Sequence, residues 1–273
     1  MTEQQSVAVA VAQFAPGADS AANLATIERL AASAVSRGAR LVVFPEYASF
    51  FEATLGEAYL DAAEPVDGPF VRRLGELADR FGIALVAGLV RRTDDPARFS
   101  NTLVAVAPGR GLVATYDKQH LYDAFGGRES EWIVPGTAGG ASTFTHEGFV
   151  FGLQTCYDVR FPEVSRLLVD AGAEIVLVPA EWVRGPLKEH HWRTLVTARA
   201  LENTVFVAAA DHAPPVGVGN SMIVDPMGVE LVTIGDESEG VAVAHLTRER
   251  LRAVREINPA LTLRRYSVVA RTD

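Results

Sequence analysis

Apolar residues form short runs that alternate with segments of helical spacing along most of the chain. The run VAVAVAQF predicts a strand at 7–14, and apolar positions repeating every three to four residues predict a helix at 20–37. The run LVVFPE at 41–46 is apolar up to its final glutamate, which is typical of a buried strand. A second helix at 69–82 begins on proline and ends on glycine, and a strand follows at 83–90. This alternation predicts the α/β class.

The second part of the chain continues the alternation. A hairpin at 101–117 turns across PGRG, and a loop rich in glycine and charge follows at 124–140. The remaining predicted elements are strands 142–146 and 149–156, helix 161–171, strand 174–180, helix 186–202, and strands 204–210, 220–226, 229–234 and 241–246. Buried strands mixed with hairpins predict mixed sheets. No repeat or polar linker divides the chain, so we expect one domain over 1–273, with its core at about 7–246 and a tail at about 257–273.

Composition argues against several classes of protein. With 48% hydrophobic and 22% charged residues among 273, the chain resembles an ordinary globular domain. A net charge of −9 disfavours nucleic acid or an anionic membrane as a partner. Apolar runs such as 82–90 have about half of the roughly 20 residues that a membrane span requires, and the N-terminus lacks a basic signal region. We therefore expect a cytoplasmic protein. The single cysteine, Cys156, excludes an internal disulfide and a cysteine-rich zinc site.

Three polar residues directly follow predicted strands, where α/β proteins usually carry their chemistry. Glu46 ends an apolar strand, Lys118 follows the strand at 112–117, and Cys156 lies between the run from 149 and a helix. Taken alone, Cys156 is more simply a buried structural cysteine, and Glu46 a chance surface glutamate. Together, the three side chains would form a reactive site if the fold brings them to one rim of a sheet.

Such a convergence would give a thiol nucleophile. A free thiol has a pKa near 8.5, so Glu46 is expected to accept its proton, while the helix start beside Cys156 favours the thiolate. Lys118 and the backbone N–H of Tyr157 would stabilise a developing oxyanion. Lysine and arginine together number 25, and only Lys118 and Lys188 are lysines. A compact ammonium suits a tight tetrahedral site better than a planar guanidinium does.

The segments FPE, YDKQHLYD and CYDVRFPE, at 44–46, 116–123 and 156–163, resemble in order and wording the Glu–Lys–Cys signature of the nitrilase, or carbon–nitrogen hydrolase, superfamily. ARALEN at 198–203 and NSMIVDPMGVEL at 220–231 resemble family segments that follow the cysteine. This resemblance spans about residues 7–246 and implies a four-layer α-β-β-α sandwich with two mixed sheets. It also implies self-association into a homodimer or a higher homo-oligomer.

The resemblance implies a second glutamate between the lysine and cysteine motifs, and Glu129 fits its distance to the following Pro-Gly better than Glu131. This glutamate would orient Lys118 and the leaving amine. His120 is expected to support the loop, not to act as the base. Arg160 is expected to pair with an acid that fixes its turn.

Three aromatic residues near the strand ends, Tyr47, Phe51 and Trp182, are candidates to line a small substrate pocket. The adjacent His190 and His191 would point about 100° apart on a helix, so they cannot chelate together. We expect neither a metal nor a cofactor.

The resemblance implies a thiol hydrolase that cleaves the C–N bond of small linear carboxamides, releasing carboxylate and ammonia through a cysteine thioester. The same residues serve hydrolases of N-carbamoyl compounds and nitrilases, so both remain alternatives. For an ω-amide, Arg184 or Lys188 would bind the distal carboxylate of the substrate. Outside the class, the alternatives are a papain-like hydrolase that uses His190 or His212, and a catalytically silent interaction module.

Overall fold

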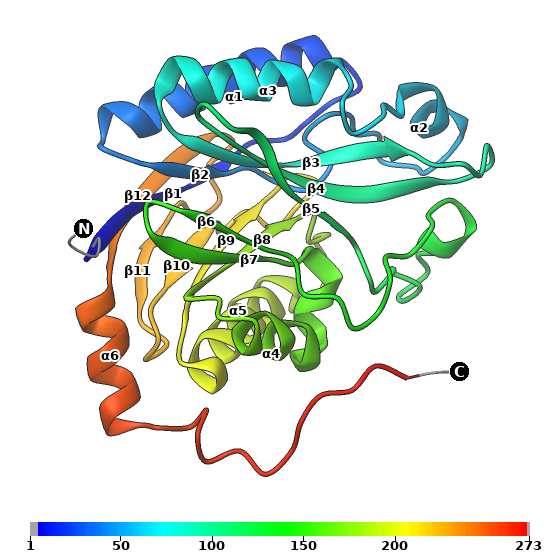
Figure 1. Cartoon of the computed structure of the whole chain (residues 1–273). Helices are drawn as coiled ribbons and strands as arrows, with labels where there is room; N and C mark the ends of the chain where they lie inside the picture. The colour runs from blue at the N-terminus through cyan, green and yellow to red at the C-terminus, as the bar shows by residue number, and fades with distance from the viewer. Residues whose placement is uncertain (1–4, 272–273) are drawn as a thin grey trace.

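A computed structural model describes residues 5–271 (Figure 1). Its elements are, in chain order, β1 (Ser6–Gln13), α1 (Ser20–Ser36), β2 (Leu41–Val43), α2 (Glu57–Ala62), α3 (Pro69–Phe81), β3 (Ala84–Arg92), β4 (Phe99–Ala107), β5 (Gly111–Asp117), the 3-10 helix η1 (Glu129–Glu131), β6 (Thr143–His146), β7 (Phe149–Leu153), the 3-10 helix η2 (Cys156–Arg160), α4 (Pro162–Asp170), β8 (Ile175–Ala180), α5 (Lys188–Asn203), β9 (Phe206–Asp211), β10 (Met222–Val224), β11 (Glu230–Thr233), β12 (Gly240–Thr247) and α6 (Arg248–Ile257).

The strands form two six-stranded sheets. The first sheet has the order β12-β1-β2-β3-β4-β5, and the second has the order β11-β10-β9-β8-β7-β6. Three neighbouring central strands run parallel in each sheet, namely β1, β2 and β3 in the first and β7, β8 and β9 in the second. The outer strands pair antiparallel. The prediction of mixed sheets is therefore confirmed.

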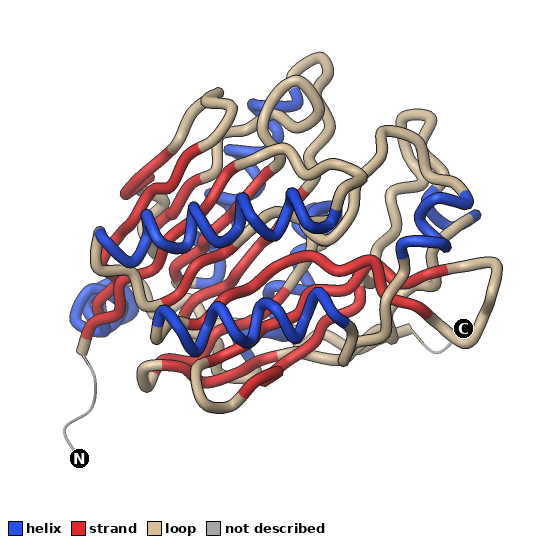
Figure 2. Tube along the Cα trace, turned by 90° about the horizontal axis from the view of Figure 1, so that it is seen from above, coloured by secondary structure: helices blue, strands red, loops and turns tan. Residues whose placement is uncertain are grey.

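The two sheets pack face to face, and helices cover their outer faces (Figures 1 and 2). On the first sheet, α1 and α3 bury apolar side chains such as Ile27 and Leu74. On the second sheet, α4 and α5 do the same with residues such as Leu168 and Val196. Apolar residues at helical spacing form one continuous stripe, so each of these helices has one face to bury. The result is the predicted α-β-β-α sandwich in a single domain.

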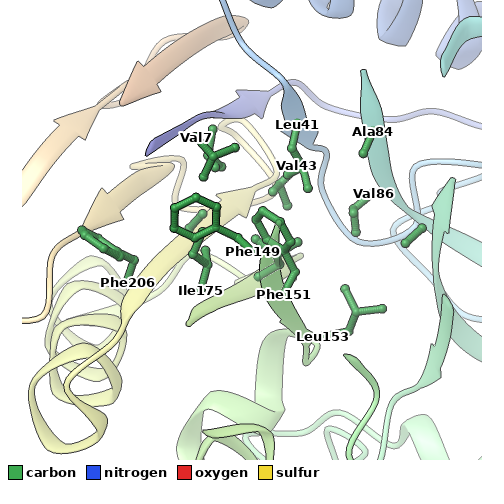
Figure 3. Packing of buried hydrophobic residues seen from close by; sticks show 14 of the residues in the cluster. Val7, Leu41, Val43, Ala84, Val86, Phe149, Phe151, Leu153, Ile175 and Phe206 are labelled. Atoms are coloured by element: carbon green, nitrogen blue, oxygen red, sulfur yellow. The ribbon is translucent and has the colours of Figure 1, made fainter. Parts of the chain in front are cut away.

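Aliphatic and aromatic side chains fill the space between the sheets (Figure 3). Val43 and Val86 from the first sheet meet Phe151 and Ile175 from the second, and all four are fully buried. A parallel strand between two packed layers is buried on both faces, which explains why the runs in β2 and β8 are continuously apolar. Burial of each such side chain contributes roughly 1.5–3 kcal/mol.

The structure differs from the predicted elements in two places that matter near the site. The strand predicted at 41–46 ends at Val43, because the chain turns at Tyr47, whose φ is 54°. The short helix α2 was not predicted, since six residues are too few to show a helical period. Among residues 5–271, no helix combines the length and the apolar character needed to cross a bilayer.

Candidate active site

Polar residues gather where three central strands and the edge strand β5 end. Glu46 follows β2 and Lys118 follows β5 in the first sheet, while Cys156 follows β7 and Glu181 follows β8 in the second. The C-terminal ends of parallel strands are a common location for active sites in α/β proteins. The structure thus brings together the three residues that the sequence placed after strands, although 110 positions separate Glu46 from Cys156.

Glu46 is a buried carboxylate, 1% exposed, with both oxygens occupied. Its Oε1 accepts hydrogen bonds from Asn101 Nδ2 at 2.6 Å and from Lys118 Nζ at 3.0 Å. Its Oε2 accepts from the backbone N–H of Glu181 at 2.6 Å. Burial raises the pKa of Glu46, and the charge of Lys118 opposes that rise. The carboxylate is therefore held in one orientation and is more basic than an exposed glutamate.

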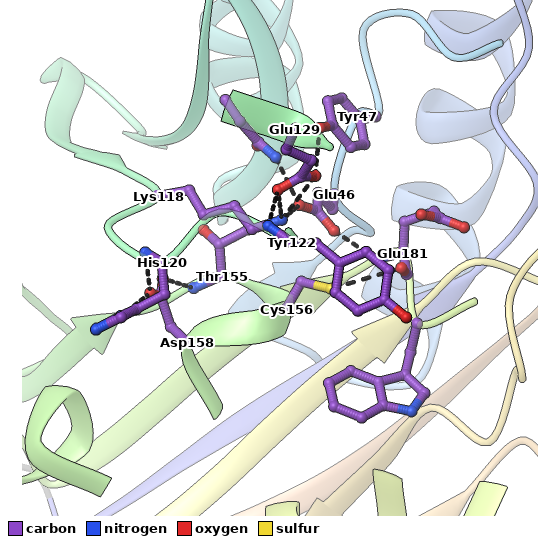
Figure 4. A network of polar contacts seen from close by, with 12 residues as sticks. Glu46, Tyr47, Lys118, His120, Tyr122, Glu129, Thr155, Cys156, Asp158 and Glu181 are labelled. Carbon is purple, nitrogen blue, oxygen red and sulfur yellow. Dashed lines mark hydrogen bonds and ion pairs between the residues drawn. The ribbon is translucent and has the colours of Figure 1, made fainter. Parts of the chain in front are cut away.

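Lys118, also 1% exposed, places its ammonium between two carboxylates (Figure 4). Its Nζ lies 2.8 Å from Glu129 Oε2 and 3.0 Å from Glu46 Oε1. Burial disfavours the charged amine, but Glu129 and Glu46 outweigh that effect and raise the pKa of Lys118 well above its usual value. The side chain therefore carries a fixed positive charge within the site.

Glu129 is the partner of Lys118, whereas Glu131 is an exposed residue that pairs with Arg128. Glu129 accepts a hydrogen bond from the hydroxyl of Tyr47 at 3.1 Å and another from the backbone N–H of Tyr122 at 2.7 Å. These donors fix the carboxylate beside the ammonium. Glu129, and not Glu131, is therefore the glutamate that lies beside Lys118.

Cys156 opens η2 in the left-handed backbone region, with a φ of 42°. Few residues other than glycine adopt this conformation, and such strain is concentrated at functional sites. Two hydrogen bonds fix the turn: the backbone N–H of Thr155 donates to the carboxylate of Asp158 at 3.2 Å, and the backbone N–H of Asp158 donates to the carbonyl of Thr155 at 2.9 Å. The N–H of Tyr157 lies in the first turn of η2, where intrahelical acceptors are lacking. It is thus available as the predicted oxyanion donor.

The surroundings of Cys156 favour the protonated thiol over the thiolate. Burial and the charge of Glu46 raise its pKa well above the usual value, and Lys118 lowers it only in part. Its Sγ donates to the backbone carbonyl of Glu181 at 3.5 Å. The sequence predicted that the helix start would favour the thiolate, but burial has the larger effect. Proton removal must therefore accompany attack by the sulfur.

Asp158 ties the lysine loop to the cysteine turn. This buried carboxylate accepts from Tyr116 Oη at 2.7 Å, from the backbone N–H of His120 at 2.9 Å and from that of Thr155 at 3.2 Å. Nδ1 of His120 also lies 2.8 Å from Asp158, and its ring stacks on Phe161 with centroids 3.7 Å apart. His120 therefore occupies a structural position away from the thiol, in keeping with its predicted role.

A small cavity lies beside Cys156. Its walls are formed by Lys118, Tyr122, Glu129, Cys156, Tyr157, Glu181, Trp182, Val183 and Lys188. Of the three predicted pocket aromatics, Trp182 lines this cavity. Tyr47 and Phe51 instead line a wider groove that adjoins it and shares Glu129, Glu181 and Lys188.

The structure corrects the prediction for Arg160. In the described part of the chain its guanidinium faces the rings of Trp182, Tyr157 and Phe125 at 5.1, 5.9 and 5.9 Å, and lies 3.4 Å from His191 Nδ1. Aromatic faces, not an acid, surround this cation.

The two histidines considered for a papain-like mechanism lie away from the thiol. His212 is buried, and its Nε2 lies 2.6 Å from the backbone oxygen of Glu46. Burial lowers the pKa of His212 to about 4, so the ring is neutral at physiological pH. His190 is exposed on α5. Neither contacts Cys156, which disfavours a papain-like pair.

Sequence reasoning missed two polar residues of the site, Glu181 and Asn101. Glu181 follows the apolar run IVLVPA just as Glu46 follows LVVFP, so the same pattern could have identified it. Asn101 lies inside β4, and its contact with Glu46 depends on strand pairing, for which the local sequence holds no signal.

An α/β sandwich with a thiol, an ammonium and two carboxylates around one small cavity defines an enzyme of the hydrolase class. The chain belongs to the carbon-nitrogen hydrolase family, whose model matches residues 8–256. A deaminated glutathione amidase of Escherichia coli O157:H7 is 38% identical over 259 residues, covering 95% of this chain and 97% of that protein.

Solved structures agree with this membership. Nit3 of Saccharomyces cerevisiae, a member of branch 10 of the nitrilase superfamily, superimposes with a TM-score of 0.85 at 26% identity and covers 97% of this chain and 98% of its own. A mutant amidase from Nesterenkonia sp. AN1 has a TM-score of 0.75 at 29% identity, covering 94% of this chain and 100% of its own. That structure contains the product of Michael addition of acrylamide at the active-site cysteine of the amidase.

Proposed function

We propose that the chain is an amidase that hydrolyses small carboxamides to a carboxylate and ammonia through a thioester on Cys156. The observation that carries this proposal is the ammonium of Lys118, fixed between Glu46 and Glu129 in the wall of the cavity that contains the thiol. The two carboxylates alone can stabilise the buried ammonium, so the fold does not require a thiol beside it. An ammonium in this position can stabilise the negative charge that develops when the thiol attacks.

In the first half-reaction, the sulfur of Cys156 attacks the carbonyl carbon of the amide while Glu46 takes the thiol proton. The oxyanion forms beside Lys118 Nζ and the N–H of Tyr157. Glu46 then passes the proton to the amide nitrogen, the C–N bond breaks, and ammonia leaves. Its raised pKa makes Glu46 a stronger base than an exposed glutamate, which this double role requires.

In the second half-reaction, water replaces ammonia and attacks the thioester carbon. Glu46 accepts a proton from the water, the C–S bond breaks, and the proton returns to the sulfur. The carboxylic acid departs and the resting thiol is restored. Glu129 holds Lys118 in position throughout and faces the space from which the amine leaves.

We propose amides, rather than carbamoyl compounds or nitriles, as the substrates, because the related proteins from Escherichia coli and Nesterenkonia are named as amidases. An amide of the deaminated glutathione type is a second candidate substrate, supported by the 38% identity to the enzyme that is named for it. A reduced nucleophilic thiol also favours a cytoplasmic location.

Two measurements test the proposal together. Acrylamide should alkylate Cys156 at neutral pH, which intact-mass spectrometry detects as one adduct, because this is the single cysteine of the chain. A panel of small amides, carbamoyl compounds and nitriles should release ammonia fastest from an amide. Ammonia release by Cys156→Ala at the wild-type rate would overturn the proposal.

A further inference from the structure

Both lysines of the chain line the same small cavity, although 25 residues are lysine or arginine. The mechanism uses Lys118 and leaves Lys188 without a role. Lys188, 8% exposed, donates one hydrogen bond to the hydroxyl of Tyr122 at 2.9 Å. The rings of Phe125, Tyr122 and Trp182 surround its Nζ at 4.6, 5.0 and 5.5 Å.

This ammonium has donors to spare. An ammonium has three N–H donors, and no carboxylate of the described residues lies within 4.0 Å of Lys188. Aromatic faces stabilise a cation, but they do not neutralise its charge. A partly desolvated cation that faces an open cavity is therefore a binding position for an anion.

Glu181 places a carboxyl group in the same cavity. Its backbone is occupied, because the N–H contacts Glu46 and the carbonyl accepts from Cys156. Within residues 5–271, no group donates a hydrogen bond to its side-chain carboxylate. The mechanism uses no part of this side chain, which lies on the cavity wall between the catalytic end and the wider groove.

The simplest structural explanation would be that Glu181 and Lys188 neutralise each other. The two side chains interact electrostatically, since Lys188 lowers the pKa of Glu181, but no direct ion pair joins them in the described structure. A cation and a separate carboxyl group that a bound ammonium would ionise are together complementary to a ligand that has two opposite charges of its own.

We propose that Lys188 and Glu181 bind the head group of a zwitterionic substrate, the ω-amide of a short α-amino acid. Lys188 binds its carboxylate and Glu181 its ammonium. This assignment rests on the proposed amidase function. Because Lys188 and Glu181 line the same small cavity as Cys156, only a few carbons can separate the head group from the amide.

Because the ionisation of Glu181 depends on the charges around it, this assignment predicts a change in its protonation when the ligand binds. A residue that only packs would show no such change. Burial and the charge of Glu46 raise the pKa of Glu181 well above its usual value, with a further rise from Glu129, while Lys118 and Lys188 oppose the shift. A bound ammonium would favour the ionised carboxylate. Binding of a zwitterion should therefore release a proton, whereas binding of its deaminated counterpart should not.

The test uses matched amides. L-asparagine, succinamate and propionamide have the same amide and carbon spacing, and they differ in the ammonium and then in the carboxylate. L-glutamine, glutaramate and butanamide form the series one carbon longer. In the better series, wild-type kcat/KM should rank zwitterion, then monoanion, then neutral amide.

Two variants assign the charges. Lys188→Met should lower the ratio of kcat/KM for the zwitterion over the neutral amide by roughly tenfold or more, because it removes a charged hydrogen bond. Glu181→Gln should lower the ratio of zwitterion over monoanion by a similar factor. Arg73→Met and Glu76→Gln remove an exposed pair 2.7 Å apart on α3, and they are the matched controls that should leave both ratios unchanged.

A folding defect in either variant would not remove the test, because calorimetry of Cys156→Ala with L-asparagine and succinamate in buffers of different ionisation enthalpy measures the proton release directly. The assignment is overturned if, in both series, the wild type hydrolyses the monoanion at least as well as the zwitterion, or if no proton is released. Failure of the amidase proposal itself would look different, since none of the six amides would then yield ammonia.

Discussion

At the residue scale, the site depends on charged groups that are buried against one another. Lys118 is enclosed by Glu46 and Glu129, and Asn101 and Tyr47 complete the hydrogen bonds of the two carboxylates. Buried charges are tolerated when they are paired and hydrogen-bonded, and removing one partner leaves the others uncompensated. The shape of each side chain therefore matters as much as its charge.

Lys118→Arg keeps the charge and should still lower kcat by about 100-fold or more, comparable to the loss of an oxyanion donor. A planar guanidinium does not fit where Nζ lies within 3.0 Å of two carboxylates. Steady-state ammonia release measures the effect, and the surface exchange Arg184→Lys is the control. Turnover within several-fold of wild type would show that the ammonium has no special role.

The pH profile of kcat/KM should reflect the raised pKa values of two groups. Glu46 must be ionised to act as the base, and burial raises its pKa, so activity should be lost on acidification at a pH above the usual 4.5. Lys118 has its pKa raised, so no alkaline loss from this group should occur below 10.5. An acid limb at or below pH 4.5 would contradict the assignment of Glu46.

The residues of the site could be predicted from the sequence where a polar side chain interrupts an apolar pattern. Glu46 and Cys156 end buried runs, and Lys118 belongs to a rare residue type in this chain. The protonation state of Cys156 was not predictable, because it depends on burial by segments distant in sequence.

At the element scale, glycines allow the loops of the site to approach neighbouring backbone. A Cβ on Gly136 would lie 2.2 Å from the backbone oxygen of Asp117, and one on Gly88 would lie 2.3 Å from the backbone nitrogen of Tyr47. The N–H of Gly136 also donates to the carbonyl of Lys118 at 2.8 Å. Both glycines thus set the positions of the segments that carry Lys118 and Glu46 without lining the cavity.

Gly136→Ala should lower kcat/KM by about tenfold or more and also lower the melting temperature, because backbone must shift to relieve the contact with Asp117. Gly75→Ala is the matched control in the interior of α3, where a Cβ would meet no atom within 4 Å. It should raise stability by about 0.5–1 kcal/mol with unchanged activity. Equal behaviour of the two variants would contradict a positioning role for Gly136.

Most elements were predictable because strands and helices here are strongly apolar or strongly periodic. The exceptions are α2, η1 and η2, which are short and held by tertiary contacts such as those of Tyr59, Glu129 and Asp158. The local pattern of apolar and polar residues contains little information about such short segments.

At the scale of the whole molecule, the two sheets repeat one arrangement, with three parallel strands inside and antiparallel strands outside. Their shared core brings the strand ends of Glu46 and Cys156 to one place. The class of fold followed from the pattern of elements, but the face-to-face pairing of the sheets followed only from the family resemblance. The periodicity of apolar residues indicates that one face of an element is buried, but it does not indicate which other element packs against that face.

We propose that the protein forms a homodimer or a larger homo-oligomer through the surface of α5 and the β10–β11 turn. Leu201, Met227 and Val229 are 43%, 43% and 53% exposed, and Gly228 packs beneath Leu201. Adjacent exposed apolar side chains mark association surfaces. Sedimentation equilibrium should give a particle mass that is a multiple of 29.3 kDa, and Leu201→Glu should reduce that mass. A monomer at micromolar concentration would contradict the proposal.

The acyl-enzyme on Cys156 is the most direct test of the central claim. Wild-type protein mixed with a hydrolysed amide, quenched in acid within the first turnovers and digested should yield the peptide of Cys156 with the mass of the acyl group added, in parallel with ammonia release. Ammonia release with an unmodified Cys156 peptide, or undiminished turnover by Cys156→Ser, would contradict the claim that this sulfur attacks the amide.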